Sequence, residues 1–249
     1  MRAPAWRNHW RAILGKLRVV ASPGEEQRLL EALSAPGASA VLGFVNAHAM
    51  NLMADDIEFY RALSAADVLL RDGSGMAILF RRAGLEPGLN MNGTDLIPKL
   101  LAAFAGRRVA LWGTEEPYLG KAAQQCQALY GVQVVSVQHG FAEAGTYLAL
   151  ARQTQPELVL LGMGMPRQEA IAARLAASGQ PCLIVCGGAI LDFLGGKVSR
   201  APGWLRRLGC EWLFRLLREP RRLFARYVLG NPLFLLRTLA CGRAAAKDG

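Results

Sequence analysis

The sequence predicts an α/β protein with a mostly parallel sheet that helices cover on both faces. Short apolar runs ending in glycine or a polar residue alternate with helical patterns along most of the chain. Such regular alternation makes each connection a crossover, and a crossover places neighbouring strands parallel. The runs that we expect to form strands are 40–45, 68–70, 108–113, 132–138, 157–162 and 181–186.

Composition divides the chain into three parts. Residues 1–22 are basic and lack a continuous apolar core, so we expect a loosely attached N-terminal leader and no signal peptide. Residues 23–196 carry the alternating pattern, which includes a helix over 49–63. Residues 197–249 are expected to form a basic amphipathic helical appendage, interrupted at Pro220 because proline cannot continue the helical hydrogen-bond ladder.

The positive charge is concentrated in this appendage. The net charge is +10, and between Lys197 and Arg237 basic residues outnumber acidic ones ten to two. Such a charge favours an anionic partner, which can be a nucleic acid, an acidic membrane leaflet or a phosphorylated substrate. Aromatic residues and leucines recur at helical spacing between the arginines, a composition typical of helices that lie on an anionic membrane. We therefore expect peripheral membrane association and no nucleic-acid partner. The uncharged, apolar stretch 178–191 is too short to span a bilayer.

The sequence offers neither a disulfide framework nor a metal site. Its five cysteines are odd in number and irregularly spaced, which favours a reducing compartment. The three histidines share no ligand spacing, and no Asp-x-Asp pair, the usual holder of Mg²⁺ or Mn²⁺ on a diphosphate, follows a strand. We therefore expect no metal and no cofactor. Any diphosphate would have to be neutralised by arginines and helix N-termini.

One carboxylate stands where α/β proteins often place their chemistry. The apolar run 68–70 leads directly into Arg71-Asp72-Gly73-Ser74-Gly75, and a helical pattern follows. Asp72 is therefore expected just past the carboxyl end of a strand. By itself, an Asp-Gly pair more often marks an ordinary turn. A second polar turn, Asn92-Gly93-Thr94-Asp95, follows in the same segment, and the two turns suggest two walls of one pocket.

Glycines follow two later strands. Gly162 and Gly164 precede a helix and resemble a phosphate-binding turn, because glycine lets backbone amides approach an anion at a helix N-terminus. They do not complete the dinucleotide fingerprint, since Arg167 stands at the third glycine position. This departure disfavours a nicotinamide oxidoreductase. Gly187 and Gly188 follow the next strand.

Taken together, these motifs resemble the WecG/TagA/CpsF family of bacterial glycosyltransferases in their order and spacing. The resemblance covers nearly the whole chain. The segments that carry it are Asn46, 67–75, 92–96, 139–140, 162–169, 187–189, 195–202 and 211–222.

The resemblance implies a Rossmann-like core whose basic appendage docks on the membrane and helps to complete the active site. It implies transfer of a sugar from a UDP-sugar donor to an undecaprenyl-diphosphate-linked saccharide in cell-surface polysaccharide biosynthesis. The donor would be UDP-N-acetylmannosamine, its uronic acid or a UDP-hexose. The expected enzyme is inverting and metal-independent and works at the cytoplasmic face of the bacterial inner membrane. Whether it forms a homo-oligomer is left open.

The resemblance also assigns roles to individual residues. It makes Asp72 the general base, Asn46 and Gln168 pocket residues, and Arg215 and Arg222 the arginines that meet the diphosphate. With the two turns and the glycines, the expected substrate-binding residues are Asn46, Asn92, Thr94, Asp95, Gly162, Gly164, Gln168, Gly187, Gly188, Arg215 and Arg222.

One position departs from the family pattern. Phe44 stands where the family often has a threonine, two residues before the asparagine, and the lost hydroxyl bears on the choice of donor or acceptor. The alternative function is a non-catalytic nucleotide-binding protein peripheral to the membrane. It would bind UDP without releasing sugar and would be indifferent to Asp72→Asn.

Overall fold

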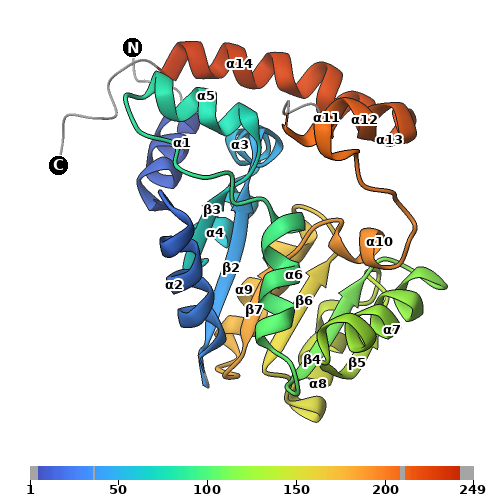
Figure 1. Ribbon diagram of the computed structural model, residues 1–249. Helices are drawn as coiled ribbons and strands as arrows, with labels where there is room; N and C mark the ends of the chain where they lie inside the picture. The colour runs from blue at the N-terminus through green and yellow to red at the C-terminus, as the bar shows by residue number, and fades with distance from the viewer. Residues whose placement is uncertain (1–4, 36, 208–210, 242–249) are drawn as a thin grey trace.

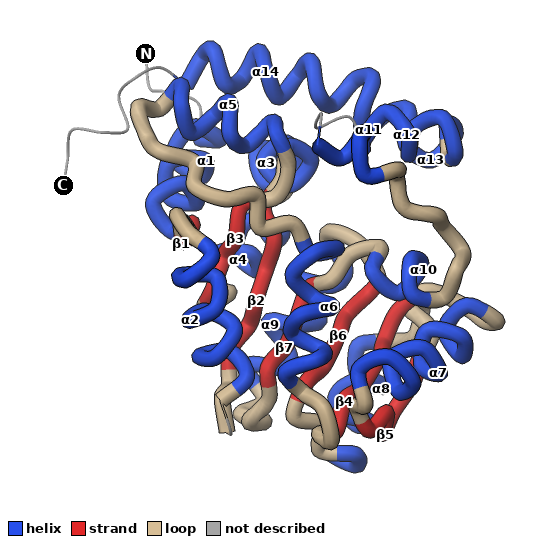
Figure 2. The backbone as a smooth tube through the Cα atoms, viewed as in Figure 1, coloured by secondary structure: helices blue, strands red, loops and turns tan. Residues whose placement is uncertain are grey.

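A seven-stranded sheet forms the centre of the protein in the computed structural model (Figures 1 and 2). The structure describes residues 5–35, 37–207 and 211–241. The strand order is β1-β3-β2-β7-β6-β4-β5, and every neighbouring pair is parallel. The predicted α/β class is therefore confirmed, with a sheet that is parallel throughout. The strands are β1 (Leu17–Arg18), β2 (Ala40–Val45), β3 (Val68–Arg71), β4 (Arg108–Gly113), β5 (Gln133–Gln138), β6 (Leu158–Gly162) and β7 (Leu183–Cys186).

Helices connect the strands and cover the sheet. Those of the core are α1 (Ala5–Lys16), α2 (Pro23–Ser34), α3 (Ala47–Asp55), α4 (Ile57–Ser64), α5 (Ser74–Arg82), α6 (Gly93–Ala103), α7 (Tyr118–Tyr130), α8 (Ala144–Thr154), α9 (Arg167–Ala177) and α10 (Ile190–Leu194). Those of the appendage are α11 (Gly203–Arg207), α12 (Glu211–Arg218), α13 (Pro220–Phe224), a π-helical segment η1 (Ala225–Leu229) and α14 (Gly230–Cys241).

Two hydrophobic cores lie on the two faces of the sheet. Successive residues of β6 alternate between them: Leu158 and Leu160 pack with α2, α6, α7 and α10, whereas Val159 and Leu161 pack with α1, α3, α4, α8 and α9. This alternation follows from the two-residue period of a strand, and both faces are apolar because helices cover both. The uninterrupted apolar run of β6 is thus the sequence signature of its central position.

The strand order reverses in the middle of the sheet. From β2 the chain passes outward to β3, then crosses to β4 on the far side and returns through β6 to β7, which pairs with β2. The crossovers on the two sides of this point leave the sheet in opposite directions, which opens a crevice above the carboxyl ends of β2 and β7. Asn46 follows β2, Asp72 follows β3 and Gly187 follows β7. The fold therefore brings the polar turns of the sequence to one edge of the sheet.

The N-terminal stretch differs from the loosely attached leader that we expected. From Ala5 onward it forms α1 and the edge strand β1, and Trp10, Ile13 and Leu14 are buried. Trp10 Nε1 donates a hydrogen bond to the Met50 carbonyl of α3 (2.7 Å). The expectation was wrong because it considered only the basic composition of this stretch, and α1 also has an apolar side that packs on the core.

The helix predicted over 49–63 is divided into α3 and α4. Asp56 lies between them, and its side chain accepts a hydrogen bond from Phe59 N (2.9 Å), which caps the first turn of α4. An aspartate at this position stabilises a new helix start, because it satisfies one of the unpaired amides of that turn.

The last helix packs against the core. Phe234 of α14 is buried against Trp10, with ring centroids 5.5 Å apart, and a Cβ added at Gly75 would lie 3.3 Å from Phe234 Cε1. Arg237 pairs with Asp55 (3.1 Å) at the end of α3. As predicted, Pro220 interrupts the appendage: it begins α13, where its missing amide hydrogen costs nothing.

Candidate active site

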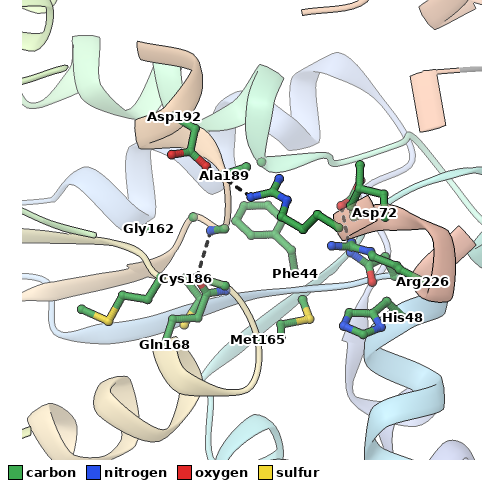
Figure 3. Close-up of a pocket in the computed structure, with 18 of the residues that line it drawn as sticks. Phe44, His48, Asp72, Gly162, Met165, Gln168, Cys186, Ala189, Asp192 and Arg226 are labelled. Atoms are coloured by element: carbon green, nitrogen blue, oxygen red, sulfur yellow. Dashed lines mark hydrogen bonds and ion pairs between the residues drawn. The ribbon is translucent and has the colours of Figure 1, made fainter. Parts of the chain in front are cut away.

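A pocket of about 720 Å³ lies at the carboxyl ends of the strands, between the core and the appendage (Figure 3). Asp72, Arg226 and His48 lie together at one end of it, and Gln168, Cys186 and Asp192 lie at the other. Most predicted site residues line this pocket: Asn46, Asp72, Thr94, Gly162, Gly164, Gln168, Gly187, Gly188, Arg215 and Arg222. Asn92 and Asp95 are not among its lining residues.

Asp72 is held at the end of β3 by its neighbours on β2. Its amide donates to the Val45 carbonyl (2.8 Å), and Asn46 Nδ2 donates to Asp72 Oδ2 (3.4 Å). The other end of the Asn46 side chain accepts from Ala49 N (3.1 Å) and caps α3. Gly73, with φ of 91°, makes the turn that follows, a conformation that favours glycine. The Asn46 amide therefore fixes the carboxylate relative to α3.

Burial raises the pKa of the Asp72 carboxyl above its ordinary value of 3.8, and this effect outweighs all the others. The hydrogen bond from Asn46 and the positive charges of Arg226, Arg215 and Arg71 act in the opposite direction. A carboxylate with a raised pKa is a stronger base than an exposed aspartate. Asp72 is therefore suited to accept a proton.

Arg226 is a pocket residue that the sequence analysis did not select. It lies on η1 and reaches the end of the pocket that holds Asp72 and His48 (Figure 3). Burial, together with the smaller effect of the Arg226 charge, lowers the pKa of His48 to about 4. His48 is therefore neutral near pH 7 and can donate one hydrogen bond and accept another. The spacing of four between Arg222 and Arg226, one helical turn, was the signal that could have identified Arg226.

The two appendage arginines whose charges act on Asp72 keep hydrogen-bonding capacity. Within the described part of the chain, neither Arg215 Nε nor Arg226 Nε has a hydrogen-bond partner. The guanidinium of Arg215 lies over the Phe193 ring at 5.6 Å, and that of Arg226 lies over the Tyr227 ring at 5.5 Å. Planar guanidinium groups held in this way are suited to bind phosphate oxygens.

Asp192 is a second pocket carboxylate that the sequence analysis did not predict. It is 8% exposed and accepts a hydrogen bond from Thr114 Oγ1 (2.5 Å). Lys197 Nζ lies 3.9 Å from its Oδ1, and an Arg222 nitrogen lies 4.0 Å from its Oδ2. Arg222 also pairs with Glu219 (2.5 Å). Arg222 therefore enters the pocket with part of its charge already balanced by acidic neighbours.

The glycines shape the pocket rather than offering free amides. The amides of Gly164 and Gly188 both donate to Gln168 Oε1, at 3.2 and 3.0 Å, and that of Gly187 donates to the Leu161 carbonyl (2.7 Å). A Cβ at Gly162 would come within 2.8 Å of Leu191. The expectation that the Gly164 amide meets a diphosphate therefore does not describe this structure, because that amide already has an acceptor.

The second predicted turn joins the core to the appendage. Asn92 Oδ1 accepts from Asp95 N (2.9 Å) and caps α6, and Asp95 pairs with Arg200 (2.6 Å). Gly93 and Thr94 of this turn line the pocket. Phe44 lies beneath them, since a Cβ at Gly93 would lie 3.4 Å from its ring. Asn92 and Asp95 are thus placed to organise the pocket wall without lining it.

The described residues contain no cluster of three or more histidine, cysteine, aspartate or glutamate side chains that could bind a metal ion. The positive charge that the pocket offers to an anion comes from side chains. These are Lys197, Arg215, Arg222 and Arg226.

The outer surface of the appendage is apolar. The large apolar side chains exposed on α11 to α14 and η1 outside the pocket lining are Trp204, Trp212, Leu213, Leu217, Phe224, Val228, Leu235, Leu236 and Leu239. Arg218 and Arg221 are exposed among them. We call this set the outer apolar surface. In the ranges that the structure describes, no helix has the length and hydropathy needed to cross a membrane.

Comparison with known proteins shows which protein family the chain resembles. The family model described as "Glycosyl transferase WecG/TagA/CpsF family" matches residues 16–248. One similar protein is the N-acetylglucosaminyldiphosphoundecaprenol N-acetyl-beta-D-mannosaminyltransferase of Bacillus subtilis (strain 168), 26% identical over 188 residues, which cover 74% of this chain and 73% of the relative. The protein of the same name from Bacillus spizizenii (strain ATCC 23059 / NRRL B-14472 / W23) is 28% identical over 190 residues, with the same two coverages.

Proposed function

Because the chain belongs to the WecG/TagA/CpsF family of glycosyl transferases, we propose that it transfers N-acetylmannosamine, its uronic acid or a hexose from a UDP-sugar to an undecaprenyl-diphosphate-linked saccharide. The observation that carries this proposal is the position of Asp72, a partly buried carboxylate in a large pocket, facing arginines from the appendage. The names of the two relatives favour N-acetylmannosamine as the sugar and N-acetylglucosaminyldiphosphoundecaprenol as the acceptor.

Asp72 acts as the general base in this proposal. The acceptor hydroxyl attacks the anomeric carbon of the donor, its proton passes to Asp72, and the bond from the anomeric carbon to the diphosphate breaks. Both electrons of the broken bond leave with UDP. A single displacement inverts the anomeric centre, which agrees with the β-linked product in the relatives' names if the donor is an α-linked UDP-sugar. General bases typically contribute ~10²- to 10⁴-fold to the rate.

Side-chain cations stabilise the departing UDP. The charges of Arg215 and Arg226 act on Asp72, and Lys197 and Arg222 lie around Asp192. We assign the diphosphate to the region between these two pairs, because the glycine amides that could have bound it are already hydrogen-bonded. The charge of these cations is our reason for proposing a metal-independent enzyme. Unchanged turnover in a chelator, with no gain from added Mg²⁺ or Mn²⁺, is the expected result.

The outer apolar surface is proposed to contact the cytoplasmic leaflet of the bacterial inner membrane. Exposed leucines and aromatic side chains can enter the interface, and the exposed arginines among them can meet anionic headgroups. This arrangement would bring the pocket, which the same appendage borders, to the level of a lipid-linked diphosphate. The undecaprenyl chain of the acceptor would then remain in the bilayer during transfer.

The test is an assay with a panel of UDP-sugars and a lipid-diphosphate-linked N-acetylglucosamine or glucose acceptor, followed by mass analysis of the lipid product. We expect the acceptor to gain the mass of one N-acetylhexosamine, its uronate or a hexose, with release of UDP. Binding of UDP without a lipid product from any donor would contradict the proposal and favour the non-catalytic alternative.

A further inference from the structure

Glu169 is a buried carboxyl group that the proposed mechanism does not use. It lies in the first turn of α9, next to Gln168, and is 2% exposed. It does not line the pocket, although its neighbours Gln168 and Cys186 do. Burying an acidic side chain beside an active site is unfavourable unless its hydrogen bonds compensate, so its partners call for an explanation.

The Gln168 side chain joins the two glycine turns of the pocket. Its Oε1 accepts hydrogen bonds from Gly164 N (3.2 Å) and from Gly188 N (3.0 Å). Gly164 belongs to the turn after β6 and Gly188 to the turn after β7, and both have positive φ, of 78° and 60°. One carbonyl oxygen thus holds together two loops that come from neighbouring strands.

This arrangement requires one of the two orientations of the Gln168 amide. In the flipped orientation, the NH₂ group would face two N–H donors and the buried carbonyl would face Glu169. In the observed orientation, Gln168 Nε2 donates to Glu169 Oε1 (2.8 Å). Glu169 therefore supplies the acceptor that makes the observed orientation the favourable one.

We propose that Glu169 is a positioning residue, which fixes the Gln168 amide and, through it, the two glycine turns that form one wall of the donor pocket. Both protonation states of Glu169 can do this, because the carboxylic acid retains a carbonyl oxygen as acceptor. Burial raises the pKa of Glu169 to about 7, which makes the neutral form accessible under ordinary conditions. An amide at position 169 should therefore replace the carboxyl group, whereas an apolar side chain should not.

Hydrogen exchange on the full-length protein tests the positioning directly and does not depend on the proposed function. In Glu169→Met, which fills the space but offers no acceptor, the amides of Gly164 and Gly188 should exchange at least about tenfold faster than in wild type. Glu169→Gln should stay within about twofold of wild type. Ile171→Ala, at a buried apolar position of the same helix, is the matched control for general loosening and should leave these two amides unchanged.

Kinetics provide the second measurement, which rests on the proposed function. Looser turns weaken ground-state and transition-state binding of the donor equally, so Glu169→Met should raise the donor KM about tenfold and leave kcat within about threefold. Glu169→Gln should restore the wild-type KM. Absence of transfer by the wild-type protein would contradict the proposed function, and the exchange result would still decide the role of Glu169.

Two results would overturn the positioning role. One is wild-type exchange at Gly164 and Gly188 in folded Glu169→Met. The other is equal acceleration in Glu169→Gln or Ile171→Ala. If Glu169→Met does not fold, wild-type NMR decides: the side-chain NH₂ of Gln168, assigned by its loss in Gln168→Met, should exchange slowly, and rapid exchange would exclude a stable bond to Glu169.

Discussion

Asp72 owes its chemical character to opposing effects on one carboxyl group. Burial raises its pKa, while Asn46 and three arginines lower it. Because the net shift is upward, the group takes up a proton at a higher pH than an ordinary aspartate. On acidification through that raised pKa, kcat/KM should fall, since only the ionised form accepts a proton.

The first prediction is that Asp72→Asn lowers kcat by ~10²- to 10⁴-fold. The variant should melt at or above the wild-type temperature, because it removes a carboxylate whose ionisation burial disfavours. Lipid-product formation and thermal unfolding are the two measurements. Asp67→Asn, at the other end of β3, is the matched control: Asp67 Oδ2 accepts from Val41 N (2.7 Å), and an asparagine oxygen can replace it. Near-normal turnover in Asp72→Asn would remove Asp72 from the role of base.

The second prediction concerns Arg226, whose charge lowers the pKa of Asp72. Replacing it with alanine should raise that pKa further and move the acidic limb of the kcat/KM profile to higher pH. It should also reduce kcat/KM by at least about tenfold through lost stabilisation of the leaving group. Arg221→Ala is the control, since Arg221 is exposed and does not line the pocket. Measured with a water-soluble short-chain acceptor, it should match wild type. If both substitutions reduced kcat/KM equally, the effect would come from the lower net charge of the protein and not from the position of Arg226.

The third prediction follows from the buried position of Glu169. Its pKa rises from 4.5 to about 7 on folding, so between these values the folded protein binds more protons than the unfolded chain. The free energy of unfolding should therefore decrease as the pH rises through this range, by ~3 kcal/mol in total at 1.36 kcal/mol per pKa unit. Chemical denaturation of wild type and Glu169→Gln at several pH values measures the difference between them. A difference independent of pH would contradict the shift.

Helix α14 has one side buried against the core and one side exposed. Its inner side places Phe234 against Trp10 and beside Gly75, three residues from Asp72 in the chain. Its outer side exposes Leu235, Leu236 and Leu239. Because α14 follows η1, which carries Arg226, its packing on the core also determines where that arginine lies. The stability of α14 and the geometry of the active site are therefore coupled.

The fourth prediction separates the two sides of α14. Phe234→Ala should cost ~3–5 kcal/mol of unfolding free energy, because it leaves a cavity in a fully buried position. Leu236→Ala, on the same helix but 65% exposed, should change stability by less than ~0.5 kcal/mol. Urea denaturation measures both values. A stable Phe234→Ala would show that α14 does not depend on this contact.

At the scale of the whole molecule, the appendage and the core form the pocket together. Asp72 and the glycine turns come from the core, and Arg215, Arg222 and Arg226 come from the appendage. Deleting everything after Arg200 would remove Phe234 and uncover Trp10, so loss of activity in such a truncation would not separate catalysis from folding. Substitutions on the outer apolar surface are the sharper test of membrane contact.

The fifth prediction uses two leucines of equal exposure. Leu236 on α14 is 65% exposed, and Leu129 on α7, a core helix that lies away from α14 in Figure 1, is 66% exposed. Leu236→Ser should weaken binding to vesicles that contain anionic lipid by about tenfold, because burying a leucine contributes ~1.5–3 kcal/mol. Leu129→Ser should not change binding. Vesicle co-sedimentation provides the measurement, and equal binding of both variants would exclude Leu236 from the membrane contact.

The sequence by itself determined the fold class and the location of the site. Alternating strands and helices fixed a parallel sheet, and crossovers bring Asn46, Asp72 and Gly187 to one edge whatever the side-chain details. The division of the chain into a core from 23 to 196 and an appendage from 197 remains a prediction, although the N-terminal stretch proved to be part of the packed structure.

Only the tertiary structure decided which polar groups face one another. In the structure the charge of Arg226 acts on Asp72, and Lys197 and Arg222 lie beside Asp192. The amides of Gly164 and Gly188 donate hydrogen bonds to the Gln168 side chain. Periodicity in a sequence reports which side of an element is buried. It does not report hydrogen-bond partners across crossovers, because these depend on how strands and helices distant in the chain pack together. For this reason Glu169 and Arg226 emerged from the structure and not from their motifs.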